Sequence, residues 1–297
     1  MLIGIGPYSL TDYKKTGNRI SQVTLEDQKE RYIYKFYLTE KDAVNAFKHG
    51  EIDILPGLSQ PYDLADWKTV TIEKTTDYSK YLAVFFNNRE AKFTKNIRQA
   101  LSYAIAKPTD ETRAIGPISP LSWAYLPALK SYEQDIPRGI ERILSEPPQE
   151  KLVLNLTTTS TYQQQAEEII TQLESFGDQA AAECVTTQSI TDKSVCPNMD
   201  LEVNLKITNF PDISNFELIL IGQESPADPD QYQLWHSEES TNFTGYKNTR
   251  IDNLLEKGRQ VVEYQERKEI YQEFQQFFLE DAPAIFIKHL DSYTIQR

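Results

Sequence analysis

Short segments with two different periods of hydrophobicity alternate along this chain, and they constrain its fold more than any other feature. Apolar residues recur at every second position in stretches such as 32–38, which is the period of a half-buried strand. At 94–105 and 266–280 they recur at the spacing of an amphipathic helix, with Thr94 as a candidate N-cap. A chain that mixes both patterns in this order is predicted to form an α/β fold with mixed sheets.

The same patterns predict where the individual elements lie. The polar stretch 26–30 predicts the turn of a hairpin, and Gly50 and Gly177 are interpreted as helix stops. The proline-rich segment 108–148 is predicted to be a long irregular connection. The predicted strands are 19–25, 32–38, 51–55, 70–74, 81–87, 151–157, 201–207, 216–222 and 284–288, and the predicted helices are 43–47, 94–105, 138–144, 161–176, 251–262 and 266–280.

Charge argues against a nucleic acid partner, and hydropathy argues against a transmembrane helix. The 297 residues carry 31 basic and 44 acidic side chains, a net charge of −13, which repels phosphate backbones. We therefore expect no nucleic acid partner. No apolar run approaches the roughly 20 residues of a transmembrane helix, and the first residues lack the basic and apolar regions of a signal peptide.

The usual catalytic motifs are missing from the sequence. His49, His236 and His289 are widely separated and do not form an HExxH zinc motif. The sequence has no GxSxG elbow, no phosphate-binding GxxxxGK[ST] loop and no GxGxxG. We therefore predict a protein that is not an enzyme, with no catalytic residues, no metal site and no cofactor.

The two cysteines, Cys184 and Cys196, lie in a polar, loop-like segment and are too far apart for a CxxC motif. Two states are open from the residues alone, a disulfide or two free thiols.

Four stretches, taken in order, resemble the family 5 extracellular solute-binding proteins, the substrate-binding components of peptide- and nickel-type ABC importers. The first is Gly-Ile-Gly-Pro-Tyr at 4–8, and the second is the helix, Gly-Glu and hydrophobic-Asp pattern at 42–55. The third is Phe-Phe-Asn-Asn at 85–88 followed by Asn-Ile-Arg-Gln-Ala-Leu-Ser-Tyr-Ala-Ile at 96–105. The fourth is Ala-Asp-Pro-Asp-Gln-Tyr at 227–232, continued at 245–255 and 266–283.

The resemblance implies a type II periplasmic-binding-protein-like fold, in which two α/β lobes enclose the ligand by hinge closure. Residues 87–283 would form a complete lobe II, and residues 1–86, with 284–297 returning to them, the remnant of an N-terminally truncated lobe I. Such a remnant is expected to expose apolar surface and to weaken ligand binding. Asn87 and Arg98, in the third stretch, are expected to have structural roles.

The function that the resemblance implies is transport without chemistry. A peptide or similar small solute would be bound and delivered to an ABC permease in the membrane. The alternative is a chaperone-like or receptor module on the same fold. The place of action would be extracytoplasmic, periplasmic or at the cell surface, with a lipoprotein anchor in the full-length protein. Export would favour a disulfide between Cys184 and Cys196.

The candidate ligand site is the loop that follows the predicted strand 216–222, because ligands bind where strands leave an open sheet. In peptide-binding members of the family an aspartate holds the amino terminus of the ligand, and Ser225 stands at that position here. We expect the adjacent Glu224 to take over this role. The predicted ligand-binding residues are Gln223, Glu224, Ser225, Asp228, Tyr232, Trp235 and Trp123. The alternatives are a capped surface loop and, for Trp123, a place in the core.

Overall fold

The structure is a computed structural model that describes residues 6–187 and 191–297. Residue contacts divide the chain into two units, the N-terminal residues up to Thr75 together with Asp291–Arg297, and Thr76–Leu290. The first resemblance stretch, residues 4–8, lies partly outside the described residues.

The sequence places the unit boundary elsewhere, between residues 86 and 87 and between 283 and 284. In the structure β5 (Thr71–Phe86) and β9 (Ala284–Gln296) each run from one unit into the other. Residues 81–86 of β5 are completely buried among residues of the second unit, so contacts place them there. The assignment of the two units to lobes stays a prediction.

The first unit begins with a three-stranded antiparallel sheet made of β1 (Ser9–Thr16), β2 (Arg19–Glu26) and β3 (Arg31–Lys35). The β2–β3 hairpin confirms the predicted turn, in which the Asp27 carboxylate accepts hydrogen bonds from two backbone N–H groups at 2.7 Å. The sequence analysis missed β1. Large apolar side chains remain exposed in and just after this sheet, namely Leu10, Tyr13, Ile20, Tyr32, Ile33, Tyr34, Phe36 and Leu38.

The rest of the first unit has a small core of its own. Helix α1 (Glu40–Lys48) starts at Thr39, whose hydroxyl caps the backbone N–H of Asp42. It is followed by β4 (Ile54–Leu58) and the short helix η1 (Tyr62–Asp66), and β4 pairs with the end of β9. The buried core residues are Val44, Phe47, Leu55, Leu58, Leu64 and Ile295.

In the second unit, a mixed sheet separates two hydrophobic cores. Its strand order is β9-β5-β8-β6-β7, in which β8 (Leu218–Glu224) pairs antiparallel with β5 and parallel with β6 (Leu152–Thr158). Strand β7 (Leu201–Ile207) runs parallel to β6. Alternate residues of β5 point to opposite faces, so Leu82 enters one core while Tyr81 enters the other.

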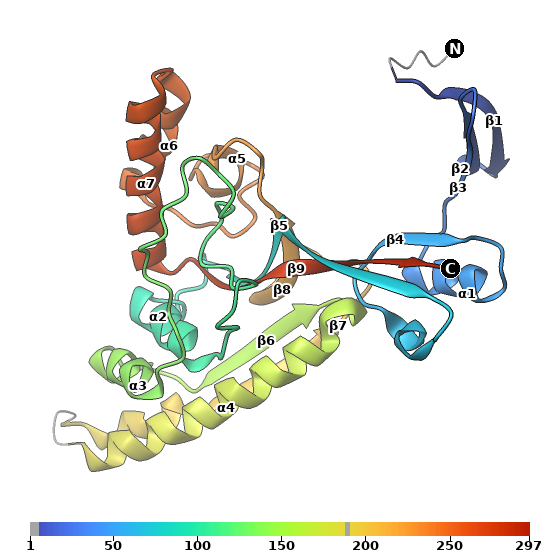
Figure 1. The fold of residues 1–297 in the computed structure, drawn as a ribbon. Helices are drawn as coiled ribbons and strands as arrows, with labels where there is room; N and C mark the ends of the chain where they lie inside the picture. Colours follow the sequence, from blue (N-terminus) through green and yellow to red (C-terminus); the bar gives the residue numbers. More distant parts are fainter. Residues whose placement is uncertain (1–5, 188–190) are drawn as a thin grey trace. The chain divides into compact units, whose positions relative to one another are not determined.

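Helices cover both faces of this sheet (Figure 1). The first core contains α2 (Lys95–Ala104), α3 (Ile136–Ser145) and α4 (Gln163–Thr186). The second contains α5 (Tyr232–Trp235), α6 (Thr249–Gln260) and α7 (Tyr264–Asp281). The short 3-10 helices of this unit are η2 (Ser160–Tyr162) and η3 (Lys193–Met199). The predicted α/β class is confirmed.

Several predicted boundaries are wrong. The predicted strands 70–74 and 81–87 form one continuous strand, β5, and the last strand, β9, extends beyond residue 288 to Gln296. Helix α4 does not end at Gly177 but continues to Thr186. A Cβ atom at Gly177 would lie 2.4 Å from the backbone nitrogen of Leu201, so this glycine allows close packing of α4 on β7 instead of ending the helix.

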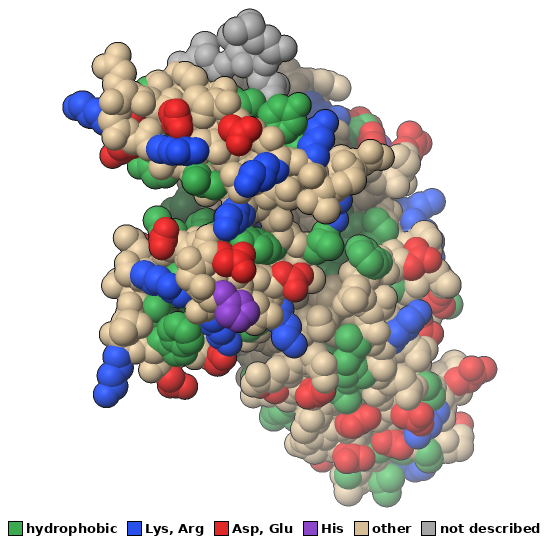
Figure 2. All heavy atoms as spheres, turned by 90° about the vertical axis from the view of Figure 1, so that its right-hand side faces the viewer, with side chains coloured by type: hydrophobic (Ala, Val, Ile, Leu, Met, Phe, Trp, Pro, Cys, Tyr) green, Lys and Arg blue, Asp and Glu red, His purple; other side chains and the backbone are tan. Residues whose placement is uncertain are grey.

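Acidic and basic side chains are interspersed on the face shown in Figure 2, with hydrophobic side chains exposed between them. No helix within the described residues has the length and hydropathy of a membrane span. These residues also contain no cluster of three or more His, Cys, Asp or Glu side chains that could hold a metal ion.

Candidate functional site

The end of β8 and the loop that follows it form one side of a hollow of about 800 Å³ in the second unit. We call it the acidic hollow, because three carboxylates and one cation line it. The loop 225–231 connects β8 to α5, and α6 contributes the cation, Arg259. The lining residues are Ile213, Ile221, Gln223, Glu224, Pro226, Asp228, Asp230, Gln231, Gln233, Leu234, Thr241, Phe243 and Arg259.

Two of the three carboxylates are neutralised by arginines. Arg267 of α7 donates two hydrogen bonds to the Asp228 carboxylate, at 2.7 and 2.6 Å. Arg259 donates to Asp230 at 2.8 Å. The hydrogen bonds from Arg267 hold the pKa of Asp228 below its usual value. These pairs hold the loop against α6 and α7, so the charge that they leave for a ligand is small.

Glu224 is different, because its carboxylate forms no hydrogen bond or ion pair with another described residue. Its side chain is exposed in the hollow, and within the described ranges 6–187 and 191–297 no hydrogen bond or ion pair reaches it. Lys80 stands opposite Glu224 in the register of β5 and β8, but its ammonium group pairs with Asp77 at 2.9 Å, and the Glu224 charge acts on it only as a weaker, longer-range interaction. An unpaired carboxylate beside apolar side chains such as Ile221 and Phe243 can bind a cationic group that has an apolar neighbour.

Tyr232 contacts the acidic hollow indirectly, through Arg259. The guanidinium of Arg259 lies 3.8 Å from the centre of the Tyr232 ring, and the other face of that ring stacks on His236, with ring centres 4.2 Å apart. Tyr232 is therefore outside the lining of the acidic hollow, although it fixes Arg259, which is inside it.

Three other predicted site residues also lie outside the hollow. Ser225 is buried and donates a hydrogen bond to the carbonyl of Pro117 at 2.6 Å, so its hydroxyl is not offered to a ligand. Trp235 is 0% exposed and packs in the second core. Trp123 packs on Tyr264, with ring centres 4.9 Å apart, and under the guanidinium of Arg267. This packing supports the alternative that Trp123 is a core residue.

Of the predicted residues, Gln223, Glu224 and Asp228 come together in the hollow. Sequence reasoning missed Arg259 and Arg267, which are 29 and 39 residues away from their aspartates along the chain. It also missed Phe243, which contacts the ring of Phe85 edge-to-face. No local pattern marks any of the three, because each approaches the loop only through tertiary packing.

The Asp228–Arg267 pair gives a prediction about pH. We expect Asp228→Asn to lower the free energy of unfolding by about 1 kcal/mol at neutral pH, a modest amount because half of the Asp228 side chain is exposed. Since pairing lowers the pKa of Asp228, its contribution is complete above about pH 4 and disappears as the pH falls through the lowered pKa. Urea denaturation over this pH range measures the difference. Asp178→Asn, which changes an exposed aspartate of α4, is the control and should have no effect.

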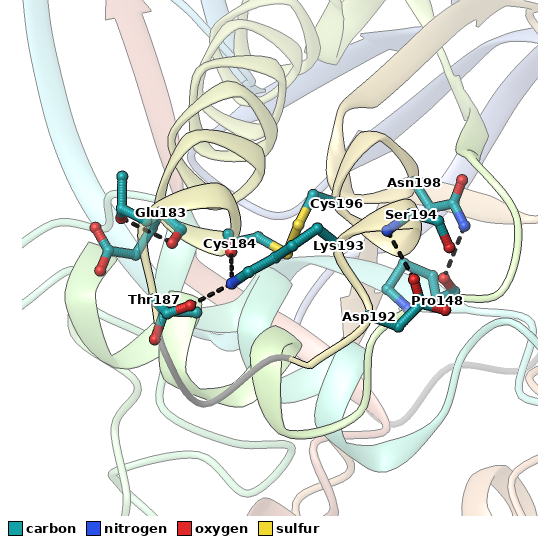
Figure 3. Close-up of a disulfide and its surroundings, with 10 residues drawn as sticks. Pro148, Glu183, Cys184, Thr187, Asp192, Lys193, Ser194, Cys196 and Asn198 are labelled. Carbon is teal, nitrogen blue, oxygen red and sulfur yellow. Dashed lines mark hydrogen bonds between the residues drawn. A yellow bond between two sulfur atoms is a disulfide. The ribbon is translucent and has the colours of Figure 1, made fainter.

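Cys184 and Cys196 form a disulfide with a Cα–Cα distance of 5.4 Å (Figure 3). It joins the last turns of α4 to η3, and both sulfurs are buried in the first core. Lys193, the first residue of η3, donates to the Cys184 carbonyl at 2.6 Å and to the carbonyl of Thr187. The ammonium group therefore stabilises the negative end of the α4 dipole.

Comparison with known proteins identifies the family. The sequence profile of the bacterial extracellular solute-binding proteins, family 5 Middle, matches residues 1–216, which is more than half of the chain. The chain belongs to this family. Its resemblance stretches at 42–55 and 85–105 lie within the matched region.

Individual relatives agree with the family. The oligopeptide-binding protein AppA of Bacillus subtilis is 22% identical to this chain, over 98% of the chain and 57% of AppA. Among solved structures, the ABC transporter substrate-binding protein CtaP of Listeria monocytogenes has a TM-score of 0.77 at 20% identity, over 98% of this chain and 61% of CtaP. NikZ of Campylobacter jejuni, in complex with Ni(L-His), has a TM-score of 0.71 at 21% identity, over 98% of this chain and 62% of NikZ.

These solved structures establish the fold, which is that of family 5 binding proteins. The chain spans about three fifths of the length of the relatives that it matches.

Proposed function

We propose that this chain is part of the substrate-binding component of an ABC importer, and that it binds a peptide or similar small solute through a cationic group held by Glu224. The observation that carries this proposal is the unpaired Glu224 carboxylate at the end of β8, in a chain of the solute-binding family. We infer delivery to a permease from the family alone.

The chemistry of the acidic hollow favours an amine-bearing organic ligand. Asp228 and Asp230 are occupied by arginines, so Glu224 is the carboxylate that is free to form a charged hydrogen bond. The apolar side chains of Ile221, Leu234 and Phe243 would pack against the carbon skeleton next to the amine. A peptide amino terminus has this combination, and the AppA structure from Bacillus subtilis was solved in complex with a nonapeptide.

We also propose an extracytoplasmic place of action and binding without chemical turnover. The Cys184–Cys196 disulfide supports this location, because structural disulfides persist in oxidising compartments. AppA and CtaP are named as binding proteins, and NikZ was solved in complex with Ni(L-His).

The test is a titration of Glu224→Gln. The chain is first screened against di- to nonapeptides, each with a free and with an acetylated amino terminus, and the tightest peptide is titrated by calorimetry. We expect the substitution to weaken the free peptide by about 1.5 to 3 kcal/mol, the contribution of a charged hydrogen bond. The acetylated peptide should bind weakly to both proteins, because it carries no amino-terminal charge.

Glu238→Gln is the matched control, since Glu238 is exposed near the same loop but does not line the acidic hollow. Equal affinity for free and acetylated peptides, unchanged by Glu224→Gln, would contradict the assignment of Glu224. Tight binding of unfolded polypeptide without binding of any short peptide would favour the chaperone-like alternative.

A further inference from the structure

A second hollow, of about 500 Å³, has the opposite charge. Eight residues line it, and four of them are cations, against one carboxylate. We call it the basic hollow. It is formed by the end of β5, the start of α2, the residues just before α6 and the end of α7. Its lining residues are Asn88, Arg89, Lys95, Arg98, Gly245, Tyr246, Lys247 and Asp281. Four cations together are unexpected in a chain with a net charge of −13.

The single carboxylate cannot neutralise these cations. Asp281 accepts hydrogen bonds from the Tyr246 hydroxyl at 2.7 Å and the Asn248 amide at 2.6 Å, and the Lys95 ammonium lies 3.1 Å from its other oxygen. Partial burial acts to raise the pKa of Asp281, but these three partners outweigh it and lower that pKa. Asp281 is thus ionised and fully engaged, and Lys95 is its ion-pair partner.

Three of the cations form no ion pair with a carboxylate of the described residues. One of them, Arg98, is partly buried and donates to the backbone carbonyls of Phe93, Asp281 and Ala282. The other two are exposed. Arg89 donates only to backbone carbonyls, those of Phe243 at 2.9 Å and Asn242 at 3.3 Å. Lys247 is exposed, and its ammonium group makes no hydrogen bond or ion pair within the part of the chain that the structure describes. Their positive charge is therefore available to a ligand.

The backbone holds Arg89 in place before any ligand arrives. Gly245 has a φ of +64°, and a Cβ atom at this position would lie 2.5 Å from Cγ of Arg89. The glycine thus makes room for the arginine side chain, and the two carbonyls fix its guanidinium. A cation that is already ordered loses less conformational entropy when it binds an anion.

We propose that the basic hollow is a binding site for an oxyanion, with Arg89 and Lys247 as its charged donors. Phosphate and carboxylate groups share the chemistry that such a pair recognises, which is a compact negative charge with several acceptor oxygens. This site differs from the acidic hollow in both lining residues and sign of charge, so an anion that is attracted to one is repelled by the other. The inference does not depend on the proposed function.

An NMR titration of the whole chain tests the proposal with two probes, inorganic phosphate and a tetra-aspartate peptide with blocked termini. We expect saturable shifts of the backbone amides of residues 245–248, and no shift of those of residues 223–228 in the acidic hollow. Added sodium chloride should weaken the binding, because it screens the charges. Lys247→Gln should weaken it about tenfold, as expected for the loss of one charged hydrogen bond.

The matched control is Lys257→Gln, which removes the same charge from an exposed lysine of α6 outside the basic hollow. It should leave the affinity within about twofold of the unmodified chain. Saturation by phosphate alone supports a free phosphate ligand, and saturation by the peptide supports a carboxylate-bearing segment. The proposal is overturned if neither probe saturates these amides, or if both lysine variants weaken binding equally.

Discussion

Replacing Trp235 with alanine is expected to lower the free energy of unfolding of the second unit by about 3–5 kcal/mol, the usual cost of removing a large buried aromatic side chain. The Trp235 indole is 0% exposed, and its ring centre is 4.5 Å from that of Phe278 and 6.1 Å from that of Phe85. Alanine would leave a cavity between β5 and α7 that the surrounding aromatic rings cannot fill. The loss would lower the melting temperature by roughly 10 °C.

Denaturant unfolding followed by circular dichroism measures this loss. Trp123→Ala is the comparison, because Trp123 is only partly buried at the edge of the same core, and it should be less destabilising. The variant Trp235→Phe tests whether Trp235 binds a ligand in addition to packing in the core. The indole N–H has no partner among the described residues, so phenylalanine removes volume but no hydrogen bond. If Trp235→Phe folds stably and abolishes peptide binding, Trp235 is a ligand-binding residue after all.

Removing the disulfide should have the second largest effect. We expect Cys184→Ala/Cys196→Ala to lower the free energy of unfolding by about 3 kcal/mol, the chain-entropy value for so short a loop. The lost packing of two buried sulfurs adds to this amount. The last turns of α4 should also fray, because Lys193 would no longer be held against the carbonyls of Cys184 and Thr187.

Denaturant unfolding with and without dithiothreitol, together with hydrogen exchange of residues 178–186, checks this prediction. Reduction should destabilise the unmodified chain and leave the double variant unchanged. Two titratable thiols in unreduced, folded protein, or equal stability of both proteins, would contradict it.

Much of the second unit was predictable, because its elements are marked by local signals. Thr94 caps α2 as predicted, and its hydroxyl accepts a hydrogen bond from the backbone N–H of Ile97. The apolar stripe of α7 enters the core through Tyr271, Phe274 and Phe278. Periods of two and 3.6 residues are properties of the chain itself, so they can be read before any packing is known.

The first unit was less predictable, since its first strand lacks a clear hydrophobic pattern. Strand β1 is exposed along its whole length and pairs with β2 through its backbone. A strand shows alternating apolar and polar residues only when one of its faces is buried. Both faces of β1 are exposed, so the sequence pattern could not reveal this strand.

The candidate site shows the same distinction. The sequence placed Gln223, Glu224 and Asp228 in the loop after a strand. In the structure Gln223 and Glu224 are the last residues of β8, and Asp228 lies in the loop that follows. The change from an apolar run to a polar loop is local, so the sequence could locate this region. It could not separate Glu224 from Asp228, whose carboxylate is neutralised by an arginine on a distant helix. Only the fold shows which of these carboxylates forms no ion pair with another described residue.

The sequence by itself determined the α/β class, the family and most of the helices and strands, since these depend on local periodicity and on motifs in order. The tertiary structure alone decided the roles of single residues. Gly177 resembles a helix stop, but the proximity of Leu201 makes it a packing residue. Trp235 belongs to a segment whose composition resembles that of a ligand site, but the aromatic rings of Phe85, Tyr246 and Phe278 pack around it. In both cases the deciding contact is with a residue far along the chain, which no local pattern encodes.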